Sequence, residues 1–245
     1  MKYDLRWVLI LLLSSLLALS SANASDVYPS RPIKIIVPFP PGGGADTLIR
    51  LISSTIGELW KQSIVIENRP GASGLIGAEL VAQAPVSASP CIVTVNPQLN
   101  INSIKGLIAY AKANPGKIRY GSSGPGSASH LSGELFAAQA GILLLHVSYK
   151  GTGQALTDLL AGHIDLLFAP AQTVMPQIES GKLLALAQTG TKRSEALPNI
   201  PTVSEAGLLG YNAVGWFGLF APADTPKATI QKINQTVFPR ITPQC

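Results

Sequence analysis

The fold class is decided by one stretch near the N-terminus, Ile33-Lys34-Ile35-Ile36-Val37-Pro38-Phe39-Pro40-Pro41-Gly42-Gly43-Gly44-Ala45-Asp46. Residues 33–37 are mostly β-branched and apolar, which predicts a strand, and apolar side chains at helical spacing over 46–60 predict a helix. The glycines between them let backbone amides approach a ligand, and the helix start adds unpaired amides and the positive end of a dipole. We therefore expect this loop to face an anion, with Asp46 as the N-cap of the helix. An ordinary strand-to-helix turn is the alternative.

The same alternation of strand and helix patterns continues along the chain. Apolar runs without polar alternation predict strands, and apolar residues three or four apart predict helices. The expected strands are 33–37, 63–67, 92–95, 118–121, 143–149, 164–168, 183–188 and 215–220, and the expected helices are 46–60, 74–84, 103–113, 127–140, 153–161, 174–180 and 226–237. This order predicts an α/β fold, with a parallel or mixed sheet covered by helices on both faces and ligands at the carboxyl ends of the strands.

Composition excludes several classes of protein. The 245 residues are 47% hydrophobic and 13% charged, so the chain can bury a core and is not globally disordered. The formal net charge is +5, but the basic residues are scattered, and Lys192-Arg193 is their only adjacent pair. Nucleic-acid binders usually gather basic residues on a stripe or a helix, so we expect no nucleic-acid partner.

The N-terminus has the layout of a secretory signal peptide. Lys2 and Arg6 precede an apolar run over residues 7–13, and the small-x-small site Ala22-Asn23-Ala24 follows. Because the apolar run is too short for a membrane span, we expect residues 1–24 to be cleaved and the protein to be exported to the periplasm. An uncleaved anchor is the alternative.

Cys91 and Cys245 are the only cysteines of the chain. In an oxidising compartment they could pair. Cys91 stands at the head of an expected strand and Cys245 is the last residue, which favours two separate thiols, and the pairing is left open.

A second glycine-rich loop again joins an expected strand to an expected helix: Tyr120-Gly121-Ser122-Ser123-Gly124-Pro125-Gly126-Ser127-Ala128-Ser129-His130. The hydroxyl groups of Ser122, Ser123 and Ser127 add to the free backbone amides, which predicts a second anion-facing loop. A serine-capped helix is the alternative. The loop lacks the third glycine of a dinucleotide fingerprint and the Gly-Lys of a phosphate-binding loop.

A third segment, Ser148-Tyr149-Lys150-Gly151-Thr152-Gly153, overlaps the end of the strand expected over 143–149. Tyr149 offers a wall and a hydroxyl, the two glycines permit a close backbone approach, and Lys150 offers a positive charge. A solvated surface position is an equally good interpretation of Lys150.

The sequence does not favour catalysis. Gly121-Ser122-Ser123-Gly124-Pro125 lacks the final glycine of a nucleophile elbow. The histidines, His130, His146 and His163, lie far apart in sequence and without metal-ligand spacing. We expect no catalytic residue, no metal site and no cofactor. The rival interpretation is an exported serine hydrolase that uses Ser123 or Ser127 with His130.

A series of motifs resembles the periplasmic solute receptors of tripartite tricarboxylate transporters, also called the Bug receptor family. In chain order they are Tyr-Pro-x-Arg-Pro-Ile with Pro-Phe-Pro-Pro-Gly-Gly-Gly-Ala-Asp (28–46), Glu-Asn-Arg-Pro-Gly-Ala-Ser-Gly (67–74), Ala-Asn-Pro-Gly-Lys (113–117), Gly-Ser-Ser-Gly-x-Gly-Ser-x-Ser-His-Leu (121–131), His-Val-x-Tyr-Lys-Gly (146–151), Ala-Leu-Pro-x-Ile-Pro-Thr-Val-x-Glu-Ala-Gly (196–207) and Trp-Phe-Gly-Leu-x-Ala-Pro-Ala (216–223). The series covers nearly all of the chain after the leader.

The resemblance implies a two-lobed periplasmic binding protein of type II that closes on a small carboxylate-bearing solute and passes it to membrane permease subunits. The implied solute is a di- or tricarboxylate, an amino acid or an aromatic acid. Lobe 1 is expected over 28–97 and 221–245, and lobe 2 over 98–220. The expected ligand-binding residues are Phe39, Pro41, Gly42, Gly43, Ala45, Asp46, Ser122, Ser123, Gly124, Gly126, Ser127, Tyr149, Lys150 and Ala169.

Three departures from the family pattern bear on function. After Ala84-Pro85 the next strand of the family, which begins Asp-Gly-Tyr-Thr, is missing together with its loops, so we expect an open sheet edge or pocket wall there. Ala169 stands where the family often has an acidic residue, so a ligand amine or hydroxyl loses a partner. The chain ends at Cys245, before the closing helix of the family. A folded remnant that binds no solute is therefore a third interpretation.

Overall fold

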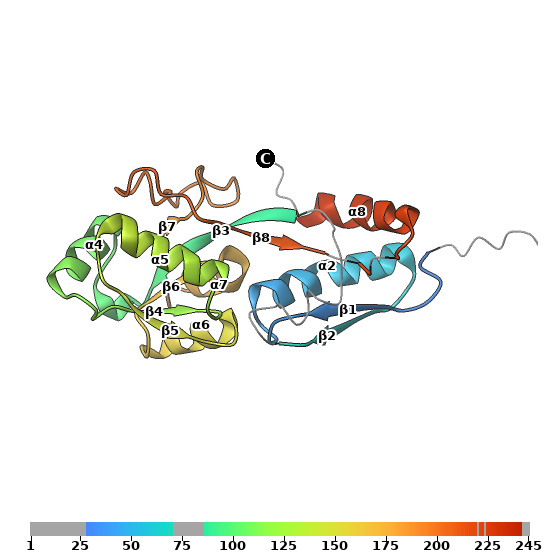
Figure 1. The fold of residues 1–245 in the computed structure, drawn as a ribbon, viewed down its shortest axis with the longest axis horizontal. Helices are drawn as coiled ribbons and strands as arrows, with labels where there is room; N and C mark the ends of the chain where they lie inside the picture. The colour runs from blue at the N-terminus through green and yellow to red at the C-terminus, as the bar shows by residue number, and fades with distance from the viewer. Residues whose placement is uncertain (1–27, 71–85, 220, 223, 242–245) are drawn as a thin grey trace, which may run out of the picture.

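The helices and strands of the computed structural model fall into two groups, which two neighbouring strands connect (Figure 1). The structure describes residues 28–70, 86–219, 221–222 and 224–241. The smaller group contains β1 (Ile33–Val37), α2 (Gly44–Trp60), β2 (Ile64–Asn68) and α8 (Lys227–Ile241). The larger group contains η3 (Pro97–Leu99), α4 (Ile104–Ala113), β4 (Arg119–Ser122), α5 (Ala128–Ala140), β5 (Leu145–Ser148), α6 (Thr152–Ala161), β6 (Leu166–Pro170), α7 (Ala171–Glu179) and β7 (Leu184–Gln188). The connecting strands are β3 (Val86–Val95) and β8 (Val214–Gly218).

The larger group is built on a mixed sheet. Its strand order is β5-β4-β6-β3-β7, and β8 pairs with the first half of β3. β4 runs parallel to β5 and β6, whereas β3 runs antiparallel to β6, β7 and β8. Because β4 and β5 are parallel neighbours, the loops that follow them leave the same edge of the sheet, where ligands of open α/β sheets bind.

Helices cover both faces of this sheet, which confirms the predicted α/β class. Leu107 of α4 and Phe136 of α5 share one buried cluster with Val93 of β3. Leu159 of α6 shares the opposite cluster with Ile92 of β3. Neighbouring residues of β3 therefore enter different apolar clusters, which explains why the strand sequences lack polar alternation.

In the smaller group, α2 and α8 pack together beside the parallel pair β1 and β2. Ile49, Ile52 and Ile56 of α2 meet Val37 of β1 and Val237 of α8 in one buried cluster. Segments from the two ends of the chain thus build one core. Helix α7 of the larger group packs against α2, so the groups are also in contact away from the connecting strands.

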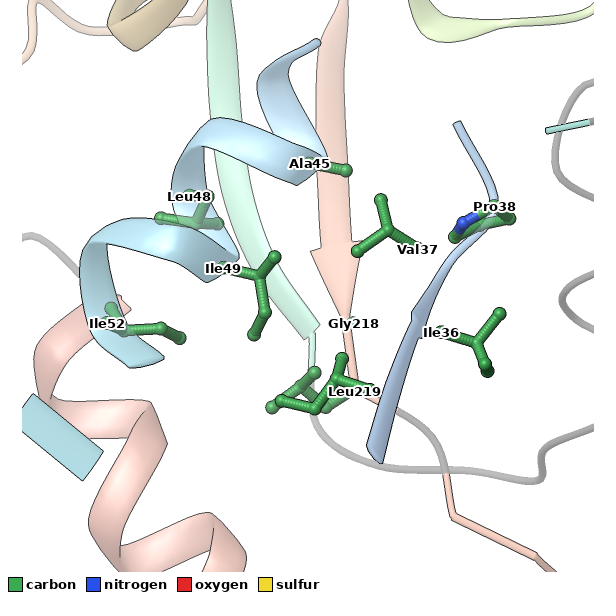
Figure 2. Close-up of a pocket in the computed structure, with 10 residues that line it drawn as sticks. Ile36, Val37, Pro38, Ala45, Leu48, Ile49, Ile52, Gly218 and Leu219 are labelled. Carbon is green, nitrogen blue, oxygen red and sulfur yellow. The ribbon is translucent and has the colours of Figure 1, made fainter. Parts of the chain in front are cut away.

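The smaller group contains an opening between β1 and β8 (Figure 2). Among the described strands, β1 pairs only with β2, and its other side faces β8 across a cavity of about 80 Å³. The lining is largely apolar and comprises Ile35, Ile36, Val37, Pro38, Ala45, Leu48, Ile49, Ile52, Gly218 and Leu219. The expectation of an open sheet edge or pocket wall after Ala84-Pro85 stays a prediction, because residues 71–85 lie outside the described part of the chain.

The observed elements lie within a few residues of the predicted ones, apart from β3. This strand begins at Val86 rather than at 92, because its first half pairs with β8, with Val86 opposite Gly218 and Pro90 opposite Val214. Serine and proline are poor strand formers, so local preference gave no sign of this extension. The expected leader over 1–24 and helix over 74–84 lie outside the described residues. None of the helices in the described ranges is both long and apolar enough to cross a bilayer.

Cys91 is buried, with 2% of its surface exposed, and is unpaired within the described ranges. Burial raises the pKa of its thiol to about 12, so the sulfur stays protonated and unreactive. Cys245 lies outside the described residues, and the expectation of two separate thiols stays a prediction.

Candidate functional site

The first glycine-rich loop joins β1 to α2 and leaves the first amides of that helix unpaired. Gly43 is the N-cap and has no side chain with which to accept a hydrogen bond. Gly42 has a φ of +79°, which glycine adopts without strain. The amides of Gly44 and Ala45 have no acceptor within the helix, because the first turn lacks preceding carbonyls. The loop therefore presents backbone N–H groups together with the positive end of the α2 dipole.

Asp46 is not the N-cap of α2, so the prediction from sequence was wrong. It is the third residue of the helix, and its Oδ2 accepts a hydrogen bond from the Gly42 amide at 2.9 Å. Arg50 Nε donates to both carboxylate oxygens at 2.9 Å, and Asn68 Nδ2 donates to Oδ1 at 2.9 Å. The prediction failed because the helical conformation already begins after Gly43. A glycine N-cap gives a weaker sequence signal than an aspartate.

The negative charge of Asp46 is compensated inside the protein. Burial raises the pKa of this carboxyl group, but hydrogen bonds from Arg50, Gly42 and Asn68 outweigh the burial, and the pKa lies below its usual value. Asn68 Nδ2 also donates to the Phe39 carbonyl at 2.9 Å. Asp46 and Asn68 therefore hold the shape of the first loop, and both oxygens of the carboxylate are already hydrogen-bonded within the protein.

The second glycine-rich loop joins β4 to α5 and contains the serine cap that was the alternative interpretation. Ser127 is the N-cap: its Oγ accepts a hydrogen bond from the His130 amide at 3.3 Å and donates one to the Gly124 carbonyl at 2.6 Å. Gly124 and Gly126 have φ values of +123° and +74°. The cap leaves the first two amides of α5 without an acceptor in the helix, so a serine cap and an anion-facing loop are compatible.

Ser122 and Ser123 are held by groups below the second loop. The hydroxyl of Ser122 is buried, accepts a hydrogen bond from the Gly124 amide at 3.1 Å, and lies 2.7 Å from Nε2 of His146. The Ser123 amide donates to Ser129 Oγ at 2.9 Å, and the two hydroxyl groups are 3.2 Å apart. The Ser122 side chain thus supports the loop, whereas Ser123 is only half-buried.

Two histidines that are distant in sequence lie together under the second loop. The ring centroids of His130 and His146 are 4.3 Å apart, and His130 Nδ1 accepts a hydrogen bond from the Gly126 amide at 3.1 Å. Burial and, next, repulsion from His130 lower the pKa of His146. Sequence reasoning treated these residues as separate, because α5 and β5 become neighbours only through the pairing of β4 with β5.

The serine–histidine arrangement of the hydrolase interpretation is not formed. Within the described residues, the hydroxyl groups of Ser123 and Ser127 bond to Ser129 and to the loop backbone, and neither bonds to the His130 ring. The acceptor nitrogen of His130 is occupied by a backbone amide, so it is not placed as a general base for either serine.

The third segment begins α6 and carries a free positive charge. Gly151 is the N-cap and makes no side-chain hydrogen bond, so the first amides of α6 are also unpaired. The Tyr149 hydroxyl donates to Asp158 Oδ2 at 2.6 Å, and burial, then this carboxylate, raises the pKa of Tyr149 to about 12. Lys150 is exposed and forms no ion pair with any residue in the described ranges.

The three loops meet at one place between the two groups. The Tyr149 amide donates to the Ser122 carbonyl at 3.0 Å, which joins the third segment to the second loop. A Cβ on Gly151 would lie 2.9 Å from Cδ of Pro40, and one on Gly153 would lie 3.2 Å from the Gly42 carbonyl oxygen. The starts of α2 and α6 are therefore in contact, and the end of β4, where the second loop begins, adjoins the segment before α6. Sequence reasoning expected two amide clusters and missed the third, although the paired glycines at 151 and 153 marked it.

Ala169 has apolar surroundings, unlike the residues of the three loops. It is fully buried in β6 and belongs to the apolar cluster that contains Ile92 and Leu159. Its methyl group offers no polar contact, so the expected role of position 169 in ligand binding has no support in its surroundings.

Comparison with known proteins places the chain in a described family. The family model for the tripartite tricarboxylate transporter family receptor matches residues 80–242. Protein BugT from Bordetella pertussis is 32% identical over 252 aligned positions, which cover 87% of this chain and 77% of BugT. Because 87% of 245 residues is about 213, roughly 39 aligned positions have no counterpart in this chain.

Two solved structures have the same fold. The structure of R. palustris Rpa4515 with adipate gives a TM-score of 0.81 at 33% identity and covers 86% of this chain and 83% of its own. MatC (Rpa3494) from Rhodopseudomonas palustris with bound malate gives a TM-score of 0.77 at 27% identity and covers 86% of this chain and 85% of its own.

Proposed function

Because this chain belongs to the tripartite tricarboxylate transporter receptor family, we propose that it binds a small dicarboxylate between its two lobes and delivers it to a membrane permease. Family membership makes it a solute receptor with the fold of a periplasmic binding protein, and not an enzyme. One observation carries the finer proposal. The starts of α2 and α6 are in contact across the two groups, and the second glycine-rich loop is hydrogen-bonded, through the Ser122 carbonyl, to Tyr149 just before α6.

Helix starts suit a carboxylate for electrostatic reasons. Each contributes about 0.3–1 kcal/mol of attraction to an anion, and up to about 2 kcal/mol when partly buried. Each hydrogen bond from an amide to a charged oxygen contributes about 1.5–3 kcal/mol. Two helix ends and three such bonds thus supply about 5–13 kcal/mol, and micromolar binding requires about 8 kcal/mol.

The proposed contacts with the solute are mostly backbone groups. They comprise the amides at the start of α2, the first two amides of α5 after Ser127, the Ser123 hydroxyl, and the side chains of Tyr149 and Lys150. The amides from Ser123 to Ser127 already donate to groups of the second loop and of the start of α5, so this part of the loop shapes the site. The side chains of Phe39, Asp46 and Ser122 belong to the supporting structure. Phe39 packs beside the core of the smaller group, and the other two are hydrogen-bonded within their own loops.

The chemistry of the loops favours a dicarboxylate over an amino acid. Asp46 is the only acidic residue in the three loops, and Arg50 and Asn68 already use its oxygens. An ammonium group of a solute would therefore find no unpaired carboxylate there. Adipate and malate, which related receptors hold in their solved structures, are dicarboxylates without an amino group.

The expected lobes are 28–97 with 221–245, and 98–220. Strand pairing moves the two points at which we propose that the chain crosses between them. The second half of β3, from Cys91 to Val95, pairs with β6 and β7, and its first half pairs with β8. The two chain crossings are therefore proposed near residues 90 and 214. Hinge bending at these strands would open and close the site.

We place the mature protein in the periplasm, after removal of residues 1–24. The layout of the leader supports export, and the relatives are periplasmic binding proteins. Mass spectrometry of protein secreted by a bacterial host tests this. A mature N-terminus at Ser25 is expected, and an intact N-terminus at Met1 would contradict it.

Thermal unfolding with a panel of acids tests the dicarboxylate proposal. At one hundred times the Kd, a ligand adds about 2.7 kcal/mol of stability, which raises the Tm of a chain of this size by about 5–11 °C. Adipate, malate or citrate is expected to give such a shift, whereas arginine and a neutral sugar are not. The absence of a shift with every acid would overturn the proposal in favour of a non-binding remnant.

A lysine pair locates the site. Lys150→Gln is expected to weaken acid binding two- to five-fold, which corresponds to about 0.5–1 kcal/mol for an exposed charge. Lys112→Gln changes a similar exposed residue on α4 and is expected to leave the Kd unchanged. Equal effects of the two variants would show only a general dependence on net charge and would contradict the placement of the solute at the third segment.

A further inference from the structure

We infer that His130 and His146 are positioning residues that keep the second glycine-rich loop in its binding conformation only while both rings are neutral, so that acid binding weakens between pH 8 and pH 6. The inference rests on the proposed function. It concerns how the loop from Gly124 to Ser127 is held, and it does not depend on which carboxylate is bound.

His130 holds the loop by accepting a hydrogen bond. The Gly126 amide donates to His130 Nδ1 at 3.1 Å, so that nitrogen carries no proton in this arrangement. In the neutral ring, the proton then resides on Nε2, which lies 3.9 Å from Oε1 of Glu134. A second proton would enter at Nδ1 and place two donors against each other. The Gly126 amide would then lose its acceptor.

His146 holds the other side of the loop through Ser122. The Ser122 hydroxyl accepts a hydrogen bond from the Gly124 amide at 3.1 Å and lies 2.7 Å from His146 Nε2. When Nε2 of neutral His146 carries no proton, the Ser122 hydroxyl donates to it. Protonation of Nε2 turns it into a donor, and the Ser122 hydroxyl hydrogen then has no acceptor among the described residues. Ser122 is fully buried, so water does not replace the lost partner.

The groups that face the two rings come from three elements. Glu134 lies one turn after His130 on α5 and hydrogen-bonds the Tyr120 hydroxyl of β4. The Tyr120 ring stacks on His146 of β5 with centroids 4.9 Å apart. Glu134 favours a positive charge on either ring, whereas the 4.3 Å separation of the two rings opposes a charge on both. Protonation of the first ring is therefore enough to disturb one of the two loop contacts.

The sign of the pH effect distinguishes this role from simple attraction. A histidinium near the site would attract a carboxylate more strongly at low pH, because the protein gains positive charge. Loss of the loop conformation acts in the opposite direction. A dicarboxylate begins to take up a proton near pH 6, but this affects the wild type and every variant equally, so the comparison between variants isolates the contribution of the protein.

Calorimetric titration with adipate from pH 8 to pH 6 provides the test. Because histidine side chains change charge between about pH 5 and pH 8, the affinity of the wild-type protein is expected to fall at least about two-fold across this range. His130→Asn places an amide oxygen near the position of Nδ1, and its affinity, normalised to its own value at pH 8, is expected to vary less with pH than that of the wild type. His163→Gln replaces an exposed histidine at the far end of α6 and is expected to keep the wild-type profile. A wild-type affinity that rises or stays constant toward pH 6 would overturn the inference.

A measurement without solute separates this inference from the proposed function. In ¹H–¹⁵N spectra of the free protein, the amide signals of Gly124 and Gly126 are expected to shift along the titration of the histidine rings, and His130→Asn is expected to abolish the shift of Gly126. If no acid binds at pH 8 and the shifts are present, the proposed function fails and the positioning role stands. If adipate binds and these amide signals do not respond to pH, the positioning role is refuted and the proposed function stands.

Discussion

Replacement of Asp46 by alanine removes an acceptor on which three groups of the first loop depend. The buried carboxylate receives hydrogen bonds from the Gly42 amide, Arg50 Nε and Asn68 Nδ2, each at 2.9 Å. Arg50 is half exposed and regains water, so its loss costs only about 0.5 kcal/mol. The Gly42 and Asn68 donors lose a charged acceptor, at about 1–3 kcal/mol each. We expect a destabilisation of about 2.5–6.5 kcal/mol in total.

Urea unfolding and thermal unfolding both measure this loss. At about 2–4 °C per kcal/mol for a chain of this size, the Tm is expected to fall by about 5–26 °C. Asp224→Ala makes the same chemical change at an exposed position and serves as the matched control. A loss below about 0.5 kcal/mol for Asp46→Ala, no larger than that of the control, would refute a structural role of the carboxylate.

The hydrogen bonds of the Asp46 carboxylate also predict how the stability of the protein depends on pH. Because the pKa of Asp46 is lower in the folded protein than in the unfolded chain, its stabilisation is complete above the unfolded carboxyl pKa of about 4. The stabilisation is lost as the pH falls through the folded value. The stability difference between the wild type and Asp46→Asn is therefore expected to narrow below about pH 4, and a difference that widens there would contradict the assigned direction.

Two further predictions concern the contact between the groups and the buried thiol. Gly153→Ala places a Cβ 3.2 Å from the Gly42 carbonyl oxygen, and is expected to weaken adipate binding about three- to ten-fold by keeping the lobes apart. Gly57→Ala, equally tight but within one lobe, is the control, and equal binding by both variants would contradict a closing contact at Gly153. In a Cys245→Ser background, Cys91 is expected to resist an aromatic disulfide reagent in the folded protein and to react at once in denaturant, since burial raises the pKa of its thiol to about 12. Rapid labelling of the folded protein would show that the Cys91 environment is open.

The local sequence pattern was sufficient to predict the fold class but not the arrangement of the candidate site. Apolar periodicity predicted the helices from α2 to α8 in the described ranges, because each buries one face against a strand pair. The first half of β3 was missed, because its pairing with β8 joins residues more than 120 positions apart. No local preference reports a partner at that distance.

The details of the site depend on contacts that a motif does not contain. Glycine spacing predicted that loops one and two expose amides, but the position of Asp46 depended on where the helix began. The role of His130 depended on the hydrogen bond from the Gly126 amide, four residues before it, and on the tertiary contact of its ring with His146. The contact of Gly42 with Gly153 required the packing of whole lobes. Each of these follows from tertiary geometry and not from composition.

In the smaller lobe, the cavity beside β1 separates the β1–β2 pair from β8 and permits movement between them. Among the described strands, no ladder of backbone hydrogen bonds joins β1 to β8, so the β1–β2 pair is attached to the rest through the side chains of α2 and α8. Packed side chains permit small sliding displacements that a continuous sheet resists. Movement around the proposed binding site is therefore not confined to β3 and β8, where the chain crosses between the lobes. The first loop, which follows β1, can therefore shift together with the β1–β2 pair relative to the rest of its lobe.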